Sequence, residues 1–144
     1  IGLGYINEFG GNIAPLFFTN LYKGAESPEN DFVHAIDISQ AKAIAERDFY
    51  GASIGMQINL GSSAIMISTL AYQDSEYGAA NLFVNDRGIR KDAYSSLKVE
   101  LDWIVTKDWN MRTMASFADN NSNGDVYTYN RSQFEINLRY AFSL

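Results

Sequence analysis

Residues 129–142 read YNRSQFEINLRYAF, and this stretch near the carboxyl end decides the fold. One set of alternate positions is apolar: Phe134, Ile136, Leu138, Tyr140 and Phe142. The other set is charged or carries an amide: Arg131, Gln133, Glu135, Asn137 and Arg139. A strict period of two predicts a β-strand with one apolar and one polar face. Strands of soluble sandwiches also alternate, but a charged face this rich, on a strand with aromatic residues at its end, is typical of a transmembrane barrel with lipid outside and water inside.

The same period predicts five further strands, over residues 1–9, 49–60, 64–74, 93–105 and 109–118. The segment 93–105 alternates most clearly, because Lys98, Glu100 and Asp102 are interleaved with aliphatic residues and Trp103. The segment 64–74 is apolar at both sets of positions, so its orientation stays open.

Short and long connections alternate between these strands. Residues 61–63 and 106–108 are tight turns, whereas 75–92 and 119–128 are long and polar. Outer-membrane barrels have short periplasmic turns and long external loops, so we expect the carboxyl terminus on the periplasmic side. Residues 10–47 form either one long loop or two extra strands near 13–22 and 32–38, with a short helix over 38–46 capped by Ser39. Both arrangements preserve the up-down parity.

Composition excludes several classes of protein. The 144 residues predict a single domain over 1–144, and no run of about 18 apolar residues is present, so a transmembrane helix is not expected. The absence of cysteine removes disulfides and thiol chemistry. A net charge of -6 disfavours a nucleic-acid partner. Because the chain starts at Ile1 without a signal peptide, we expect a processed chain or a segment of a longer one.

The predicted fold class is therefore all-β, an antiparallel up-and-down transmembrane β-barrel. We expect roughly six to eight strands in this chain, which form a barrel by themselves or part of a larger one. The expected lumen-facing polar residues are Lys98, Glu100, Asp102, Arg112, Arg131, Glu135, Asn137 and Arg139. The expected residues at the lipid or the membrane interface are Trp103, Trp109, Phe134, Ile136, Leu138, Tyr140 and Phe142. The charges either line a conduit for polar cargo or fill a small barrel with cross-strand ion pairs.

Several motifs are similar to those of a known family. They are RDFYG at 47–51, DWNMR at 108–112, DNNSN at 119–123, VYTYNR at 126–131 and LRYAF at 138–142. This set resembles the carboxyl-terminal barrel domains of outer-membrane proteins with tetratricopeptide repeats, typified by the surface lipoprotein assembly modifiers. Two features depart from that pattern: Ser143 and Leu144 follow Phe142, and the helical repeat domain is not among these residues.

The resemblance implies transport or translocation across the bacterial outer membrane, without catalysis. The cargo would be a surface lipoprotein or an exported polymer, and the partners would be the outer-membrane bilayer and the barrel assembly machinery. The alternative is a small structural or ligand-binding barrel, soluble and lipocalin-like, with its apolar face inside.

Three further candidate sites, for a metal ion, for catalysis and for ligand stacking, each have a simpler interpretation. Asp119, Asn121, Asn123, Gly124 and Asp125 have the spacing of the start of a calcium loop. The twelfth position is Asn130 in place of a bidentate glutamate, so an asparagine-rich external turn is the favoured interpretation. The only histidine, His34, lies near Asp31 and Asp37 in the sequence, as a catalytic dyad or triad of an outer-membrane hydrolase would require. A solvated loop histidine is the favoured interpretation, and the hydrolase is the least favoured function. Stacking of a ligand competes with membrane-interface anchoring, the simpler explanation, for Trp103, Trp109, Tyr127, Tyr129 and Tyr140. No cofactor or metal is expected.

Overall fold

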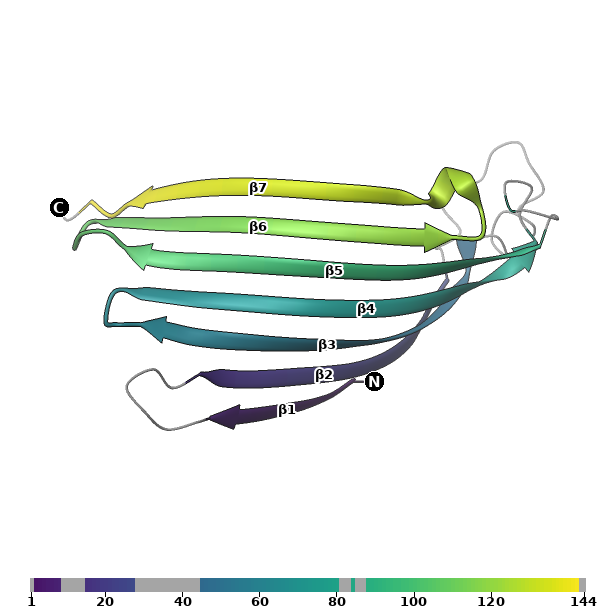
Figure 1. Ribbon diagram of the computed structural model, residues 1–144, viewed down its shortest axis with the longest axis horizontal. Coiled ribbons are helices and arrows are strands. Elements are labelled where there is room, and N and C mark those ends of the chain that lie inside the picture. The colour runs from purple at the N-terminus through teal and green to yellow at the C-terminus, as the bar shows by residue number, and fades with distance from the viewer. Residues whose placement is uncertain (1, 9–14, 28–44, 81–83, 85–87, 143–144) are drawn as a thin grey trace.

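The computed structural model describes residues 2–8, 15–27, 45–80, 84 and 88–142. These residues form β-strands and one short 3-10 helix, which Figure 1 shows as a single curved layer. In chain order the elements are β1 (Gly2–Glu8), β2 (Leu16–Glu26), β3 (Arg47–Leu60), β4 (Ala64–Ala80), β5 (Ile89–Ile104), β6 (Trp109–Ser122), η2 (Asp125–Tyr127) and β7 (Tyr129–Tyr140).

Each strand pairs antiparallel with its neighbour in the sequence, which gives one seven-stranded sheet in the order β1-β2-β3-β4-β5-β6-β7. The predicted antiparallel up-and-down arrangement is confirmed. The sheet formed by the described residues is open, because β1 and β7 each have a neighbour on one side only. The described residues therefore do not form a closed barrel by themselves, which was one of the two predicted arrangements. Since the strand number is odd, β1 and β7 run in the same direction (Figure 1).

Three strands are longer than the sequence predicts. β4 continues to Ala80, β5 begins at Ile89 and β6 continues to Ser122, so much of what was assigned to long loops is sheet. The polar residues in these extensions are paired across strands, as in the 3.0 Å ion pair between Lys91 and Glu76. Opposite charges stabilise a strand pair as apolar contacts do. The strands therefore continue through these polar residues, whose low hydrophobicity had suggested loops.

The region 10–47 contains one strand of the described sheet, β2, which lies between β1 and β3. β2 overlaps the first of the two predicted extra strands. The second, at 32–38, the helix predicted over 38–46, and His34 with its neighbouring aspartates lie largely or wholly outside the described residues. With β2 in place, β1 runs in the same direction as β3, whereas both predicted arrangements made them antiparallel.

The β3–β4 and β5–β6 turns lie together at one end of the sheet, which we call the turn end; the β4–β5 and β6–β7 connections lie at the other, the loop end (Figure 1). Gly61 opens the β3–β4 turn with φ of 71°, a left-handed conformation that glycine adopts without strain. In the β5–β6 turn, Thr106 Oγ1 accepts hydrogen bonds from the backbone N–H groups of Asp108 (3.3 Å) and Trp109 (3.1 Å). The predicted alternation of connections and the position of the carboxyl end at the turn end are therefore observed.

Aromatic rings lie over glycines between β2 and β3. The ring of Phe18 covers Gly55, the ring of Tyr22 covers Gly51, and Phe49 covers Gly24. A Cβ at Gly51 would stand 2.5 Å from the Tyr22 ring, and one at Gly55 would be closer still to Phe18. Glycine is therefore required at these positions as long as the rings keep their places, a pairing that pins strand register.

The described residues have almost no apolar core. Val84 is the one buried hydrophobic residue among them, and no second layer of secondary structure covers either face of the sheet. Among these residues, no helix has the length and apolar character needed to cross a membrane.

The contact between Phe18 and Gly55 predicts a substitution whose sign depends on its background. Alanine in a strand is ordinarily favoured over glycine by about 0.5–1 kcal/mol. Here Gly55→Ala should lower the free energy of unfolding by about 1 kcal/mol, because the new methyl group displaces the Phe18 ring. In a Phe18→Ala background the same substitution should be stabilising. Urea unfolding of the four proteins measures both effects; a Gly55→Ala effect of equal size and sign in both backgrounds would contradict the ring contact.

Candidate functional site

The register of the strands assigns every side chain to one of two faces, because directly paired residues in a sheet point to the same side. Asp102 pairs with Arg112, and Arg112 pairs with Asn137. Extending these pairs along the strands brings all the expected lumen residues to one face, which we call the polar face: Lys98, Glu100, Asp102, Arg112, Arg131, Glu135, Asn137 and Arg139.

The opposite surface, the apolar face, carries the residues expected at the lipid. Trp109 pairs with Tyr140, and Met111 pairs with both Trp103 and Leu138. The residues placed there are Trp103, Trp109, Phe134, Ile136, Leu138 and Tyr140. Phe142 follows the end of β7 and packs edge-on against Tyr140 with ring centroids 4.6 Å apart. The register also settles the orientation of β4: Ala64 pairs with Trp103 and Leu70 with Leu97, so the set from Ala64 to Tyr72 is on the apolar face.

The apolar face is a broad, exposed hydrophobic surface. Leu21, Ile54, Leu70, Phe117 and Phe134 are between 53% and 70% exposed although they lie in the middle of strands. By contrast, the buried polar residues among those described, Ser75, Asp92 and Asn120, all lie on the polar face. The apolar face is therefore uncovered in the described sheet, and the few buried polar side chains lie on the other face.

This surface has a charge-free belt with aromatic borders. Tyr72 pairs with Ser95 and Ala64 pairs with Trp103, so β5 crosses the belt in about nine residues, or ~27 Å at ~3.3 Å per residue. Between these two rows, the described residues of the apolar face include no Asp, Glu, Lys or Arg, and Asp119 stands in the border row beside Ser95. Tyr50 and Tyr72 share Asp74 at the loop-end border. The turn-end border has Trp103 and the ring pair of Trp109 and Tyr140, with centroids 4.9 Å apart.

The charges of the polar face are partly compensated. Arg112 forms a bidentate pair with Asp102, with Nε–Oδ1 and Nη2–Oδ2 distances of 2.7 and 2.9 Å, and Lys98 lies 2.7 Å from Glu100. Arg131 donates a hydrogen bond to Gln133. Arg139 has no ion-pair or hydrogen-bond partner among the described residues. Cross-strand pairing and an uncompensated cation therefore coexist on this face.

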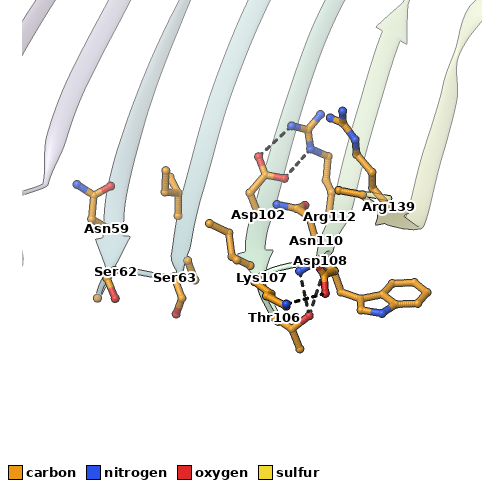
Figure 2. Close-up of a pocket in the computed structure, with 16 residues that line it drawn as sticks. Asn59, Ser62, Ser63, Asp102, Thr106, Lys107, Asp108, Asn110, Arg112 and Arg139 are labelled. Atoms are coloured by element: carbon orange, nitrogen blue, oxygen red, sulfur yellow. Dashed lines mark hydrogen bonds and ion pairs between the residues drawn. The ribbon is translucent and has the colours of Figure 1, made fainter. Parts of the chain in front are cut away.

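A hollow of about 710 Å³ lies on the polar face near the turn end (Figure 2). Figure 2 shows the guanidinium groups of Arg112 and Arg139 side by side in it, with Asp102 holding only the first. Asn110, which pairs with Arg139, and Asn59 supply amide groups to its lining. The hollow can therefore accept polar or anionic groups at the turn end.

A second cluster, which we call the rim cluster, stands at the loop end of the same face. Arg90 donates two hydrogen bonds to Asp92, at 2.9 and 2.5 Å. Its guanidinium lies between two tyrosine rings, 3.5 Å from the centroid of Tyr127 and 4.3 Å from that of Tyr77. Such stacking on both sides is a cation–π arrangement. It fastens η2, which carries Tyr127, to the start of β5.

Side-chain amides of two asparagines add hydrogen bonds to backbone groups at this attachment. Asn123 Nδ2 donates to the Ile89 carbonyl (2.8 Å), and its Oδ1 accepts from the Lys91 N–H (2.9 Å). Asn120 Nδ2 donates to the Tyr127 carbonyl (2.8 Å). Sequence reasoning missed the rim cluster, because Arg90 and Asp92 were assigned to a loop. The available signal was the polar alternation of 90, 92 and 94, which continues the strand.

Electrostatics at the rim stabilise the ionised pairs. Burial raises the pKa of the Asp92 carboxyl, but hydrogen bonds from Arg90 and Ser122 outweigh burial, so the pKa lies below its ordinary value. Arg47 donates a 2.8 Å hydrogen bond to Glu26, and this bond lowers the pKa of that exposed carboxyl. Both arginines at the rim are thus held in ion pairs.

The residues of the calcium-loop pattern are spread over different structures. Asp119 and Asn121 belong to β6 and lie on the apolar face, whereas the amide of Asn123 is bonded to β5. Among the described residues no three His, Cys, Asp or Glu side chains are grouped to hold a metal ion. The tyrosines expected to anchor at the membrane interface also differ from that expectation: Tyr129 pairs with Asn120 on the polar face, and Tyr127 stacks on Arg90.

Comparisons with known proteins add no relative: no family model, no curated protein and no solved structure matches the chain.

The rim cluster predicts that Asp92 controls the attachment of η2. Asp92→Asn removes the charge that holds Arg90, so amide hydrogen exchange in residues 123–128 should accelerate about tenfold or more, since hydrogen bonds to charged groups contribute about 1.5–3 kcal/mol. Because folding lowers the pKa of Asp92, its stabilisation is complete above its ordinary pKa of 3.8 and is lost as the pH falls through the lowered value. The wild type should therefore approach the variant in acid. Asp125→Asn, in η2 itself, is the control and should leave exchange unchanged; equal acceleration in both variants would refute the role of Asp92.

Proposed function

We propose that the chain forms part of the wall of a bacterial outer-membrane β-barrel. The apolar face contacts lipid, and the polar face lines an aqueous conduit that guides polar cargo. The function is transport or translocation, and the wall does no chemistry of its own. The bilayer and the barrel assembly machinery are the partners that this placement requires.

The segregation of charge between the two faces carries this proposal. In the rows where the apolar face has no charge, the polar face holds Lys98, Glu100, Asp102, Arg112, Arg131 and Glu135. An ionised group in the hydrocarbon of a bilayer is costly, whereas the same group in a water-filled lumen is not. A soluble sheet also excludes charge from a face that packs on a core, but among the described residues no second layer packs on the apolar face.

The dimensions of the belt support the same conclusion. A transmembrane β-strand needs about 9–11 residues, and β5 crosses the belt in about nine. Barrels in outer membranes have an apolar band about 25 Å high between aromatic girdles, and tyrosines and tryptophans border this belt at its two ends.

A soluble, lipocalin-like barrel is the rival function, and the burial pattern counts against it. Such a barrel encloses its apolar residues, but the described part of this sheet leaves them exposed and buries Ser75, Asp92 and Asn120 instead. Val84 alone is too little apolar burial to stabilise a domain in water.

The two open edges indicate that the complete barrel contains additional strands. An unpaired strand edge is not tolerated in lipid, because its N–H and C=O groups have no partner there. β1 and β7 run in the same direction, so an odd number of added strands between them makes every pair antiparallel. The barrel would then be wider than this sheet, which favours a charged conduit over a lumen filled by ion pairs.

The resemblance to the surface lipoprotein assembly modifiers bears on the cargo. If the chain belongs with those proteins, the conduit serves surface lipoproteins or another exported polymer. The last hairpin, β6 and β7, carries most of the shared motifs and also most of the charged lumen residues.

A matched pair of arginine substitutions on β4 tests the proposal. Ser68→Arg is on the apolar face near the middle of the belt, and Ala71→Arg is on the polar face, where Ser53 and Ser96 flank it. In the complete barrel, folded in lipid vesicles, Ser68→Arg should lower the free energy of unfolding by about 2–4 kcal/mol, while Ala71→Arg should change it little. Equal costs at the two positions, or folding of the wild type in buffer without lipid or detergent, would refute the membrane wall.

The conduit predicts a change of ion selectivity at Arg139. Arg139→Glu replaces a cation that has no partner among the described residues, so the permeability ratio in planar bilayers should shift towards cations. Lys91→Glu changes the net charge equally, but Lys91 lies on the apolar-face side of the loop end, so its effect should be much smaller. An unchanged ratio for Arg139→Glu would argue against an open lumen lined by this face.

A further inference from the structure

The polar face has a tyrosine-lined hollow of about 360 Å³ at the loop end, beneath the rim cluster. This volume falls in the range of small-molecule sites, about 300–1,000 Å³. The register places Gln73, Tyr94, Asn120 and Tyr129 in one row across β4, β5, β6 and β7. A linear ligand that lies across the strands meets all of them.

The charges around this hollow cancel in pairs. Arg90 is bound to Asp92, and Arg47 is bound to Glu26 with an Nε–Oε2 distance of 2.8 Å. Each guanidinium also lies over an aromatic ring, Arg90 over Tyr77 and Tyr127 and Arg47 over Phe49. With each cation neutralised by its own carboxylate, the hollow offers no net charge to attract an ionic ligand.

Uncharged hydrogen-bonding capacity remains. The hydroxyl groups of Tyr94 and Tyr129 have no partner among the described residues, and Tyr129 is 48% exposed. Gln73 uses Nε2 to reach Ser75, and Asn120 uses Nδ2 to reach the Tyr127 carbonyl, so each side chain keeps a carbonyl oxygen free to accept. Flat rings beside amides and hydroxyls suit a ligand with apolar faces and many hydroxyl groups.

We propose that this hollow binds a segment of a neutral polysaccharide. The C–H face of a sugar ring stacks on Tyr129 or Tyr94, and the sugar hydroxyls pair with Gln73, Asn120 and the phenol groups. This inference rests on the proposed function and names its cargo class: an exported glycan that touches the conduit at its loop-end mouth.

Titration with neutral oligosaccharides tests the site. The complete barrel that contains this chain is folded in dimethyldodecylamine oxide micelles, which carry no sugar headgroup, and titrated calorimetrically with maltohexaose, cellohexaose and chitohexaose. At least one should bind, and Tyr129→Ala should weaken it about fivefold or more, as expected for loss of one stacking ring. Tyr129→Phe keeps the ring and should retain most of the affinity. Since Tyr129 is half exposed on an edge strand, neither substitution should prevent folding.

Tyr72→Ala is the matched control, because Tyr72 lies in the neighbouring row on the apolar face, and it should leave binding unchanged. The inference is overturned if none of the three neutral sugars binds, if Tyr129→Ala binds as tightly as the wild type, or if hexagalacturonate, an anionic sugar, binds more tightly than all three. The two proposals fail separately. Folding without lipid or detergent defeats the membrane wall, whereas a complete barrel that folds in micelles and does not bind neutral sugars defeats only the glycan site.

Discussion

The hydrogen-bond ladder of the sheet is the constraint from which the other properties of this protein follow. In a strand the side chains alternate strictly, so a slip of one residue would exchange the faces of the whole strand. The register from β3 to β7, which shifts only between Glu76 and Ala80, therefore sets the charged face, the apolar belt and the hollows at once. The rings of Phe18 and Tyr22, seated over Gly55 and Gly51, fix the same register between β2 and β3. Loss of either glycine would disturb the alignment on which both faces depend.

Much of this architecture is readable from the sequence, and the exceptions have physical causes. The alternation in β5 and β7 predicts both faces correctly, because charged and apolar residues are strictly interleaved there. The alternation does not predict the orientation of β4, because Ile65 and Ile67 are as apolar as Met66 and Leu70. Only its pairing with β3 and β5 decides which set lies on the apolar face. The rim cluster was missed because Arg90 and Tyr127 are far apart in the sequence and meet only through the β6–β7 connection. Closure is not readable either, since it depends on strands that pair with β1 and β7.

The sheet lacks the usual source of stability of a globular domain. Folding in water depends on apolar surface removed from solvent, yet residues such as Leu70 and Phe117 stay more than half exposed. In a bilayer such residues would already be in an apolar medium. The requirement that remains is a hydrogen-bond partner for every backbone N–H and C=O group. The ladder, together with ion pairs such as Asp102–Arg112, then supplies most of the cohesion. Charged side chains of the polar face contribute by joining neighbouring strands, as Arg112 does with Asp102.

The odd number of strands in the described sheet has a consequence for self-association. A second copy added head to tail in the same orientation would place its β1 beside β7 as a parallel pair, because the two strands run the same way. An antiparallel pair of two β7 strands would instead turn one copy upside down, with its loops on the side of the other's turns. Copies in one orientation can therefore join at their open edges only through a parallel pair. Each open edge accepts an oppositely directed strand as an antiparallel partner, which continues the pattern of the described sheet.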